Sequence, residues 1–143
     1  MKIHTIGYQE ATLEGVISAL QAAGITQLID VRALPRSRRP GMSKTALAGA
    51  MAEAGIDYVH LQALGTPAAG RNAARKGDRD TLEKVYGDQL ELPEAVAAAA
   101  VLEEQASKRP SALFCYCRDA SKCHRSILRR ERLAGFEQVD LLP

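Results

Sequence analysis

Apolar and polar positions along the chain alternate in blocks that predict short strands separated by helices. In the segment Leu13–Ala23 the apolar residues recur at helical spacing, and Thr12 precedes them as a capping residue. Gln27–Val31 is a short, almost wholly apolar run, which fits a strand buried on both faces of a parallel sheet. The chain therefore switches between helical and extended periodicity within its first 31 residues.

The same criteria assign strands and helices to the rest of the 143 residues. The predicted strands are Lys2–Gly7, Gln27–Val31, Ile56–Leu61, Ser111–Cys117 and Gln138–Leu142. The predicted helices are Leu13–Ala23, Lys44–Ala54, Asp80–Leu90, Pro93–Ser107 and Cys123–Ala134. Residues 64–78 are rich in Gly, Ala and basic side chains without clear periodicity, so we expect a mobile loop or lid there. With no repeat or linker, residues 1–143 are predicted to form a single α/β domain of three layers, an open, mostly parallel sheet of about five strands with helices on both faces.

Composition narrows the class of protein. Hydrophobic residues make up 46% and charged residues 25%, as in an ordinary globular domain. Aromatic residues are only 4%, with no Trp, which disfavours broad base-stacking platforms. The first residues show no signal-peptide pattern and no apolar run is long enough to span a bilayer, so we expect a cytoplasmic protein that does not bind membranes. The three cysteines lie close together, unlike the framework of a disulfide-rich secreted domain.

The net charge is only +2, but basic residues gather in two clusters. The first cluster is Arg32, Arg36, Arg38, Arg39 and Lys44; the second is Arg118, Lys122, Arg125, Arg129, Arg130 and Arg132. In open α/β sheets ligands bind beyond the carboxyl ends of the strands. Those ends are Gly7–Tyr8, Arg32–Arg39, Leu61–Gly65 and Cys117–Cys123. Basic loops at one edge predict an anion-binding cleft, although each cluster can equally be a solvated surface.

The segment Cys117–Ser126 is the densest group of reactive side chains, at a turn from a strand into a helix. A helix N-terminus favours anions, and its field together with neighbouring cations lowers the pKa of a thiol. The guanidinium of Arg125 can donate bidentate hydrogen bonds to a phosphate, sulfate or carboxylate. A thiolate, a guanidinium and exposed amide groups would together make a nucleophile with an oxyanion site.

Structural interpretations compete with each of these roles. We expect Cys115 to be a buried apolar residue, whereas Cys117 and Cys123 could either fill the core or react. The spacing Cys-x-Cys followed by Cys-His lacks the paired Cys-x2-Cys of common zinc sites, so we expect no metal and no cofactor. His124 could be an ordinary histidine, Asp30 could simply pair with Arg32, and Gly7 could serve only a tight turn.

At this point the chain resembles a family, domain of unknown function 488. The resemblance rests on residues 5–8, 28–32, 35, 37–39, 54–61, 64–65, 117 and 123–126, which span nearly the whole chain. It implies a fold and a set of site positions without a reaction. A looser similarity, to the rhodanese-like and cysteine-phosphatase architectures, rests on residues 28–32, 114–118, 125–126 and 135–139 and implies thiol chemistry. In those enzymes the loop from Cys to Arg is shorter than the span from Cys117 to Arg125.

Three functions remain open at this stage, and the sequence does not decide whether the protein is an enzyme or how it oligomerises. The first is a thiol-dependent enzyme acting on an anionic small molecule. The second is a nucleotide- or nucleic-acid-binding protein that contacts a phosphate-bearing ligand through the basic loops. The third is a non-catalytic domain that binds a partner protein. The candidate catalytic residues are Cys117, Cys123, His124 and Asp30, and the candidate anion-binding residues are Arg125, Ser126, Arg32, Arg38, Arg39, Gly7 and Tyr8.

Overall fold

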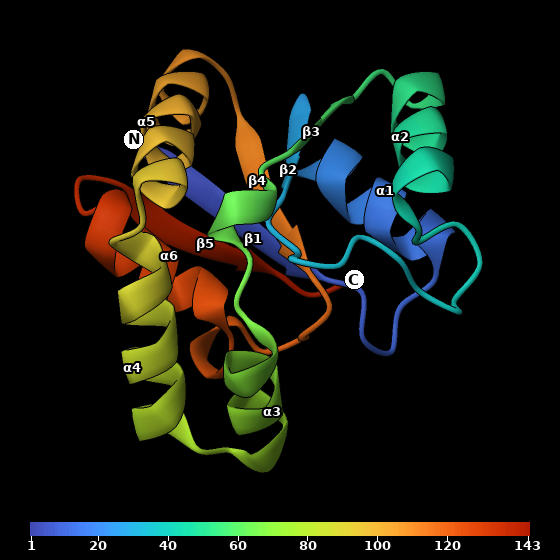
Figure 1. The fold of residues 1–143 in the computed structure, drawn as a ribbon. Helices are drawn as coiled ribbons and strands as arrows, with labels where there is room; N and C mark the ends of the chain where they lie inside the picture. The colour runs from blue at the N-terminus through green and yellow to red at the C-terminus, as the bar shows by residue number, and fades with distance from the viewer.

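A five-stranded parallel sheet forms the centre of the protein, which we describe from a computed structural model of residues 1–143 (Figure 1). The strands are β1 (Lys2–Gly7), β2 (Gln27–Asp30), β3 (Asp57–His60), β4 (Ser111–Cys115) and β5 (Glu137–Leu141). Their order across the sheet is β3-β2-β4-β1-β5, and every neighbouring pair is parallel. The predicted α/β fold is confirmed, and the sheet is wholly parallel.

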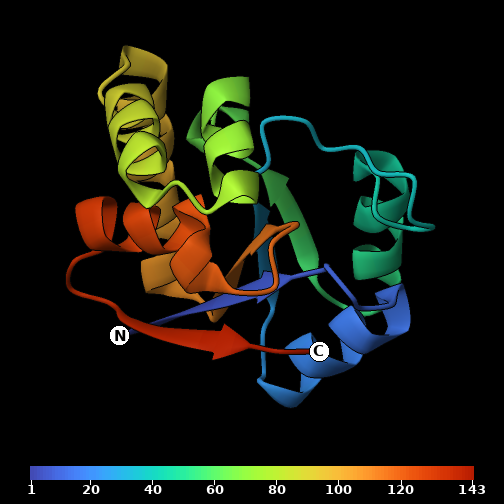
Figure 2. The ribbon, with the colours of Figure 1, turned by 90° about the horizontal axis from the view of Figure 1, so that it is seen from below.

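Helices cover both faces of the sheet. The α-helices are α1 (Leu13–Ala22), α2 (Lys44–Glu53), α3 (Ala68–Lys76), α4 (Arg79–Leu90), α5 (Pro93–Lys108) and α6 (His124–Arg132). Helices α1 and α2 pack on one face, and α3 to α6 lie on the other (Figures 1 and 2). Each face has its own buried cluster, one around Leu20 and Met51 and the other around Leu82 and Leu102. None of these helices has the length and apolar content needed to cross a bilayer.

Burial within the strands follows their position in the sheet. Every residue of β2 and β4 is buried, because these strands lie inside the sheet and both of their faces are covered. The edge strands β3 and β5 are partly exposed. The strands that end at the candidate residue Asp30 and at Cys115 are therefore among the most enclosed elements of the fold.

The expected mobile loop at 64–78 is wrong for most of its length. A short 3₁₀ helix at Gln62–Leu64 leads into α3, which ends at Gly77 in the left-handed conformation (φ 74°). The buried positions of α3 are Gly70 and Ala73, whose side chains are too small to produce a visible apolar periodicity. At Gly70 a Cβ atom would lie 2.1 Å from Thr66 Oγ1, so the helix depends on glycine for its close approach.

The exits of β1 and β4 touch each other through the backbone. A Cβ atom on Gly7 would lie 1.8 Å from the carbonyl oxygen of Cys117, so only glycine fits at this position. The Gln9 amide then donates to the Tyr116 carbonyl at 2.8 Å. Gly7 thereby sets the path of the segment that follows β4.

We predict that Gly7→Ala destabilises the protein by about 3 kcal/mol, because the added methyl group would overlap the Cys117 carbonyl. Chemical denaturation measures the free energy of unfolding. Gly49→Ala is the matched control, since that glycine lies in α2 with nothing within 4 Å of its Cβ position. Alanine should stabilise that helix by about 0.5–1 kcal/mol. Equal effects of the two substitutions would contradict the contact.

Candidate functional site

The candidate site forms where β4 ends and α6 begins. Cys115 is the last residue of β4, and His124 is the first residue of α6, directly after Cys123. Between them a 3₁₀ helix at Ala120–Lys122 is capped by Asp119, whose carboxylate accepts from the Ser121 amide at 2.9 Å. This turn returns the chain to the end of β4, so residues eight positions apart become neighbours.

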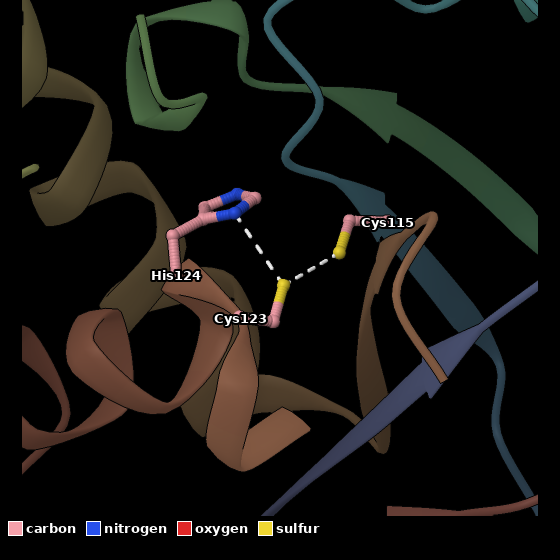
Figure 3. A group of neighbouring side chains, drawn as sticks. All are labelled: Cys115, Cys123 and His124. Carbon is pink, nitrogen blue, oxygen red and sulfur yellow. Dashed lines mark hydrogen bonds between the residues drawn. The ribbon is translucent and has the colours of Figure 1, made fainter. Parts of the chain in front are cut away.

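Cys123 lies between the two other side chains of the cluster (Figure 3). Its Sγ is 2.8 Å from Cys115 Sγ and 3.5 Å from His124 Nδ1. All three residues are buried, with Cys115 exposed by 3% and Cys123 by 1%, and both cysteines are free thiols. Two sulfur atoms in direct contact thus lie in the interior beside an imidazole ring.

The His124 ring is held by its other nitrogen. Nε2 lies 2.8 Å from the carbonyl oxygen of Val31, which follows β2, and therefore donates its proton there. The edge of Tyr86 packs against the ring with centroids 5.0 Å apart, and the Tyr86 hydroxyl donates to the Leu64 carbonyl. Nδ1 is consequently directed at Cys123 by contacts with two other parts of the fold.

Arg125 is fully buried beneath the thiols. Its Nη2 donates to the Cys117 carbonyl, while Nε and Nη1 have no hydrogen-bond acceptor. Burial opposes the charge of Arg125, whereas the thiols of Cys115, Cys123 and Cys117 raise its pKa. A buried cation without a counter-charge is strongly unfavourable, so the anionic partners available to Arg125 are these thiols and the exposed carboxylate of Asp119, whose pKa its charge helps to lower.

The three thiols have different ionisation properties. Burial raises the pKa of Cys123, but hydrogen bonds from the Cys115 and Cys117 thiols and the charges of His124 and Arg125 outweigh it, and the pKa falls well below the usual value. Burial holds the pKa of Cys115 well above its usual value. The pKa of Cys117 rises to about 11, because its hydrogen bond to Cys123 and its partial burial outweigh the opposite effect of a hydrogen bond with Cys115. Cys123 is therefore the thiol whose ionisation these surroundings favour.

The ligand atoms of Cys115, Cys123 and His124 lie within 4.8 Å of one another, a grouping that could accept a metal ion. A tetrahedral zinc ion with Zn–S bonds of about 2.3 Å needs its two sulfur ligands about 3.8 Å apart. The observed 2.8 Å is too short by about 1 Å. As placed, the two sulfur atoms are closer than a shared zinc ion requires and farther apart than the ~2.05 Å of a disulfide bond.

A second buried network lies at the end of β2. The Asp30 carboxylate accepts from Arg32 Nε at 2.9 Å and Nη2 at 2.8 Å, and from the Tyr58 hydroxyl at 2.5 Å. Arg32 also donates to the Met42 carbonyl at 2.7 Å. Its guanidinium is fully engaged within the protein, and Asp30 and Arg32 pair with each other and do not contact the thiols.

The structure places the other candidate residues in several environments. Arg39 donates to the carbonyl oxygens of Tyr8 and Ala11 and so fastens its loop to the exit of β1. Tyr8 is buried and stacks on Phe114 with ring centroids 5.3 Å apart. Arg38 is exposed. The Ser126 hydroxyl donates to the Cys123 carbonyl at 3.2 Å and lies 3.3 Å from Arg79 Nη2. The anion-binding roles of these residues stay predictions.

Two members of the cluster's surroundings were not selected as functional from the sequence. The sequence predicts Cys115 as a core residue, and its spacing of two from Cys117 predicts that both side chains face the same way. No sequence pattern marks Tyr86 as functional, since a tyrosine at a buried helix position looks like any other apolar residue there. Their relevance appears only from the contacts with Cys123 and His124.

The cluster is closed in this structure. Cys115 and Cys123 are buried, and only the neighbouring Cys117 is partly exposed. A pocket of about 310 Å³ is lined by Arg79, Ser121, Lys122 and neighbouring residues of α3 and α4, and by no cysteine. A reactant must therefore be small or must enter as the turn moves.

Comparison with protein families gives one match. The family described as Domain of unknown function DUF488 matches residues 12–131 of the 143-residue chain. The protein belongs to the DUF488 family. No curated protein and no solved structure matches it. Within this DUF488 domain the matched range includes the whole cluster from Cys115 to Arg125.

We predict that Asp30→Asn destabilises the DUF488 domain by about 3–5 kcal/mol, because it leaves the buried Arg32 guanidinium without its counter-charge. Tyr58→Phe removes one hydrogen bond to the same carboxylate and should lower stability by about 1.5–3 kcal/mol. Thermal and chemical denaturation compare the two variants. A larger loss in Tyr58→Phe than in Asp30→Asn would contradict the dominance of the ion pair.

Proposed function

We propose that the protein is a thiol-dependent enzyme whose nucleophile is the Cys123 thiolate. Its reactant would be a small molecule that is anionic, or that releases an anion when the thiolate attacks it. The observation that carries this proposal is the buried Arg125 guanidinium beside three thiols, with two of its nitrogen donors unpaired. The ionised thiolate, and not the neutral thiol, is the nucleophilic form of cysteine.

Each neighbour of Cys123 supports a distinct part of such a reaction. Cys115, whose sulfur lies 2.8 Å away, can donate a hydrogen bond to the thiolate and stabilise its charge. His124 Nδ1 at 3.5 Å is close enough to exchange a proton with the sulfur or with a leaving group as the site tightens. The Nε and Nη1 groups of Arg125 have no acceptor and are suited to a developing negative charge.

The phosphate-binding alternative rests on fewer free groups. Of the basic residues that follow β2, Arg32 and Arg39 are engaged with Asp30 and with backbone carbonyls. Arg36 and Arg38 are exposed and would be the residues to contact a nucleotide or nucleic acid. Neither this alternative nor docking of a partner protein accounts for a buried guanidinium among three thiols.

We predict that one thiol of the native protein ionises well below the usual pKa of about 8.5. The ultraviolet absorbance of the thiolate, followed from about pH 4 to about pH 9 with chelator and reductant present, measures this without requiring access to the buried sulfur. Cys123→Ser should abolish the low-pKa transition. Arg125→Met should move it upward, whereas Arg125→Lys should keep most of the shift because it keeps the charge.

The groups that face Cys123 are the thiols of Cys115 and Cys117, His124, Arg125 and, from α4, Tyr86. None of the other thiols has a lowered pKa, so the low transition has one assignment. If wild type and Cys123→Ser gave the same thiolate titration curve, Cys123 would not be ionised and the proposal would be wrong.

Stability should depend on pH in a matching way. Because the pKa of Cys123 is lower in the folded protein than in the unfolded chain, ionisation stabilises the fold above about pH 8.5, and this stabilisation is lost as pH falls through the folded pKa. We predict that the stability of wild type relative to Cys123→Ser increases between about pH 5 and about pH 8.5. Urea denaturation at several pH values measures the difference, and a flat or falling difference would contradict the prediction.

A further inference from the structure

We propose that Cys115 is the resolving thiol for Cys123, and that the pair cycles between dithiol and disulfide with a small hydroperoxide as oxidant. This inference rests on the proposed function, since it needs the Cys123 thiolate, and it adds the class of reactant and a second reacting residue. The structure suggests it through the direct contact of two buried sulfur atoms from different elements (Figure 3).

The sulfur atoms already lie close to bonding distance. Their separation is 2.8 Å, against about 2.05 Å in a disulfide, so bond formation needs a shift of less than about 1 Å. The contact joins the end of β4 to the residue before α6, and both side chains are at most 3% exposed. Cys117 is the more accessible thiol, and its pKa is raised as that of Cys115 is, so the choice of Cys115 rests on its direct sulfur contact with Cys123.

Because the site is closed, only a small oxidant can reach Cys123. A bulky disulfide such as oxidised glutathione cannot contact Cys123, which is 1% exposed, without opening the turn at 117–123. A hydroperoxide is small and enters without bringing a charge into the interior. It releases an anion only after attack, where the unpartnered Nε and Nη1 of Arg125 lie beside the reacting sulfur.

The reaction balances in two steps. The Cys123 thiolate attacks one oxygen of the hydroperoxide ROOH; the O–O bond breaks, a sulfenic acid forms on Cys123, and the leaving alkoxide takes up the proton that Cys123 had released to solvent. The Cys115 thiol then attacks the Cys123 sulfur, and the hydroxide that departs takes the Cys115 proton as water. Two thiols and ROOH give one disulfide, ROH and water. A dithiol reductant restores both thiols.

The test treats the reduced, chelator-washed full-length protein with one equivalent of hydrogen peroxide. Alkylation of the remaining thiols under denaturing conditions and peptide mapping then locate the oxidised residues. We expect wild type to lose two of its three thiols and to form a Cys115–Cys123 bond, which dithiothreitol reverses. Cys117→Ser should form the same bond. Cys115→Ser should stop at a sulfenic acid on Cys123, trapped by dimedone, and Cys123→Ser should react at least about 30-fold more slowly, as an ordinary thiol does.

Other outcomes overturn the inference. Oxidation confined to Cys117, a Cys117–Cys123 bond, or loss of the Cys115–Cys123 bond in Cys117→Ser would each exclude Cys115 as the resolving thiol. Retention of one equivalent of zinc after chelation, with no disulfide formed, would make the cluster a metal site. The thiolate titration separates the two proposals: a low-pKa Cys123 without disulfide formation removes only the resolving role, whereas its absence removes both. Circular dichroism confirms that each variant is folded.

Discussion

The charge of one buried side chain determines the character of the region around it. Arg125 has no exposed surface, lies at the start of α6 and has three thiols among its ionisable neighbours. Because a solitary charge in the interior is strongly unfavourable, this region is stabilised by a negative partner, and Cys123 is the buried group that we propose provides it. On that proposal, ionisation of a cysteine helps to stabilise the turn between β4 and α6.

The protein contains a second buried arginine with a conventional partner. Arg32 pairs with the carboxylate of Asp30, two residues earlier in the same segment, and Tyr58 completes the network from β3. Between them Val31 presents the carbonyl that orients His124. The network around Asp30 thus fixes the backbone at Val31, whose carbonyl orients His124 beside the thiols. Both buried arginines therefore stabilise the same edge of the sheet.

Much of the fold could be predicted from the sequence, because buried strands and amphipathic helices leave clear apolar patterns. Helix α3 could not, since its packing positions are Gly70 and Ala73 and its close approach depends on small size. At the site, the sequence placed Cys123, His124 and Arg125 together but could not show which guanidinium donors are already engaged. Arg39, for example, bonds backbone carbonyls that no sequence pattern reveals. Likewise, no sequence pattern shows that Cys115, expected as a core residue, lies in direct contact with Cys123.

The contact at Gly7 has a consequence for how sequences with this fold can vary. Any side chain at position 7 would collide with the carbonyl group of residue 117 and not with its thiol, so the restriction is independent of which amino acid occupies position 117. A compensating replacement there cannot relieve it. Position 7 therefore has a single permitted occupant, whatever side chain stands at position 117.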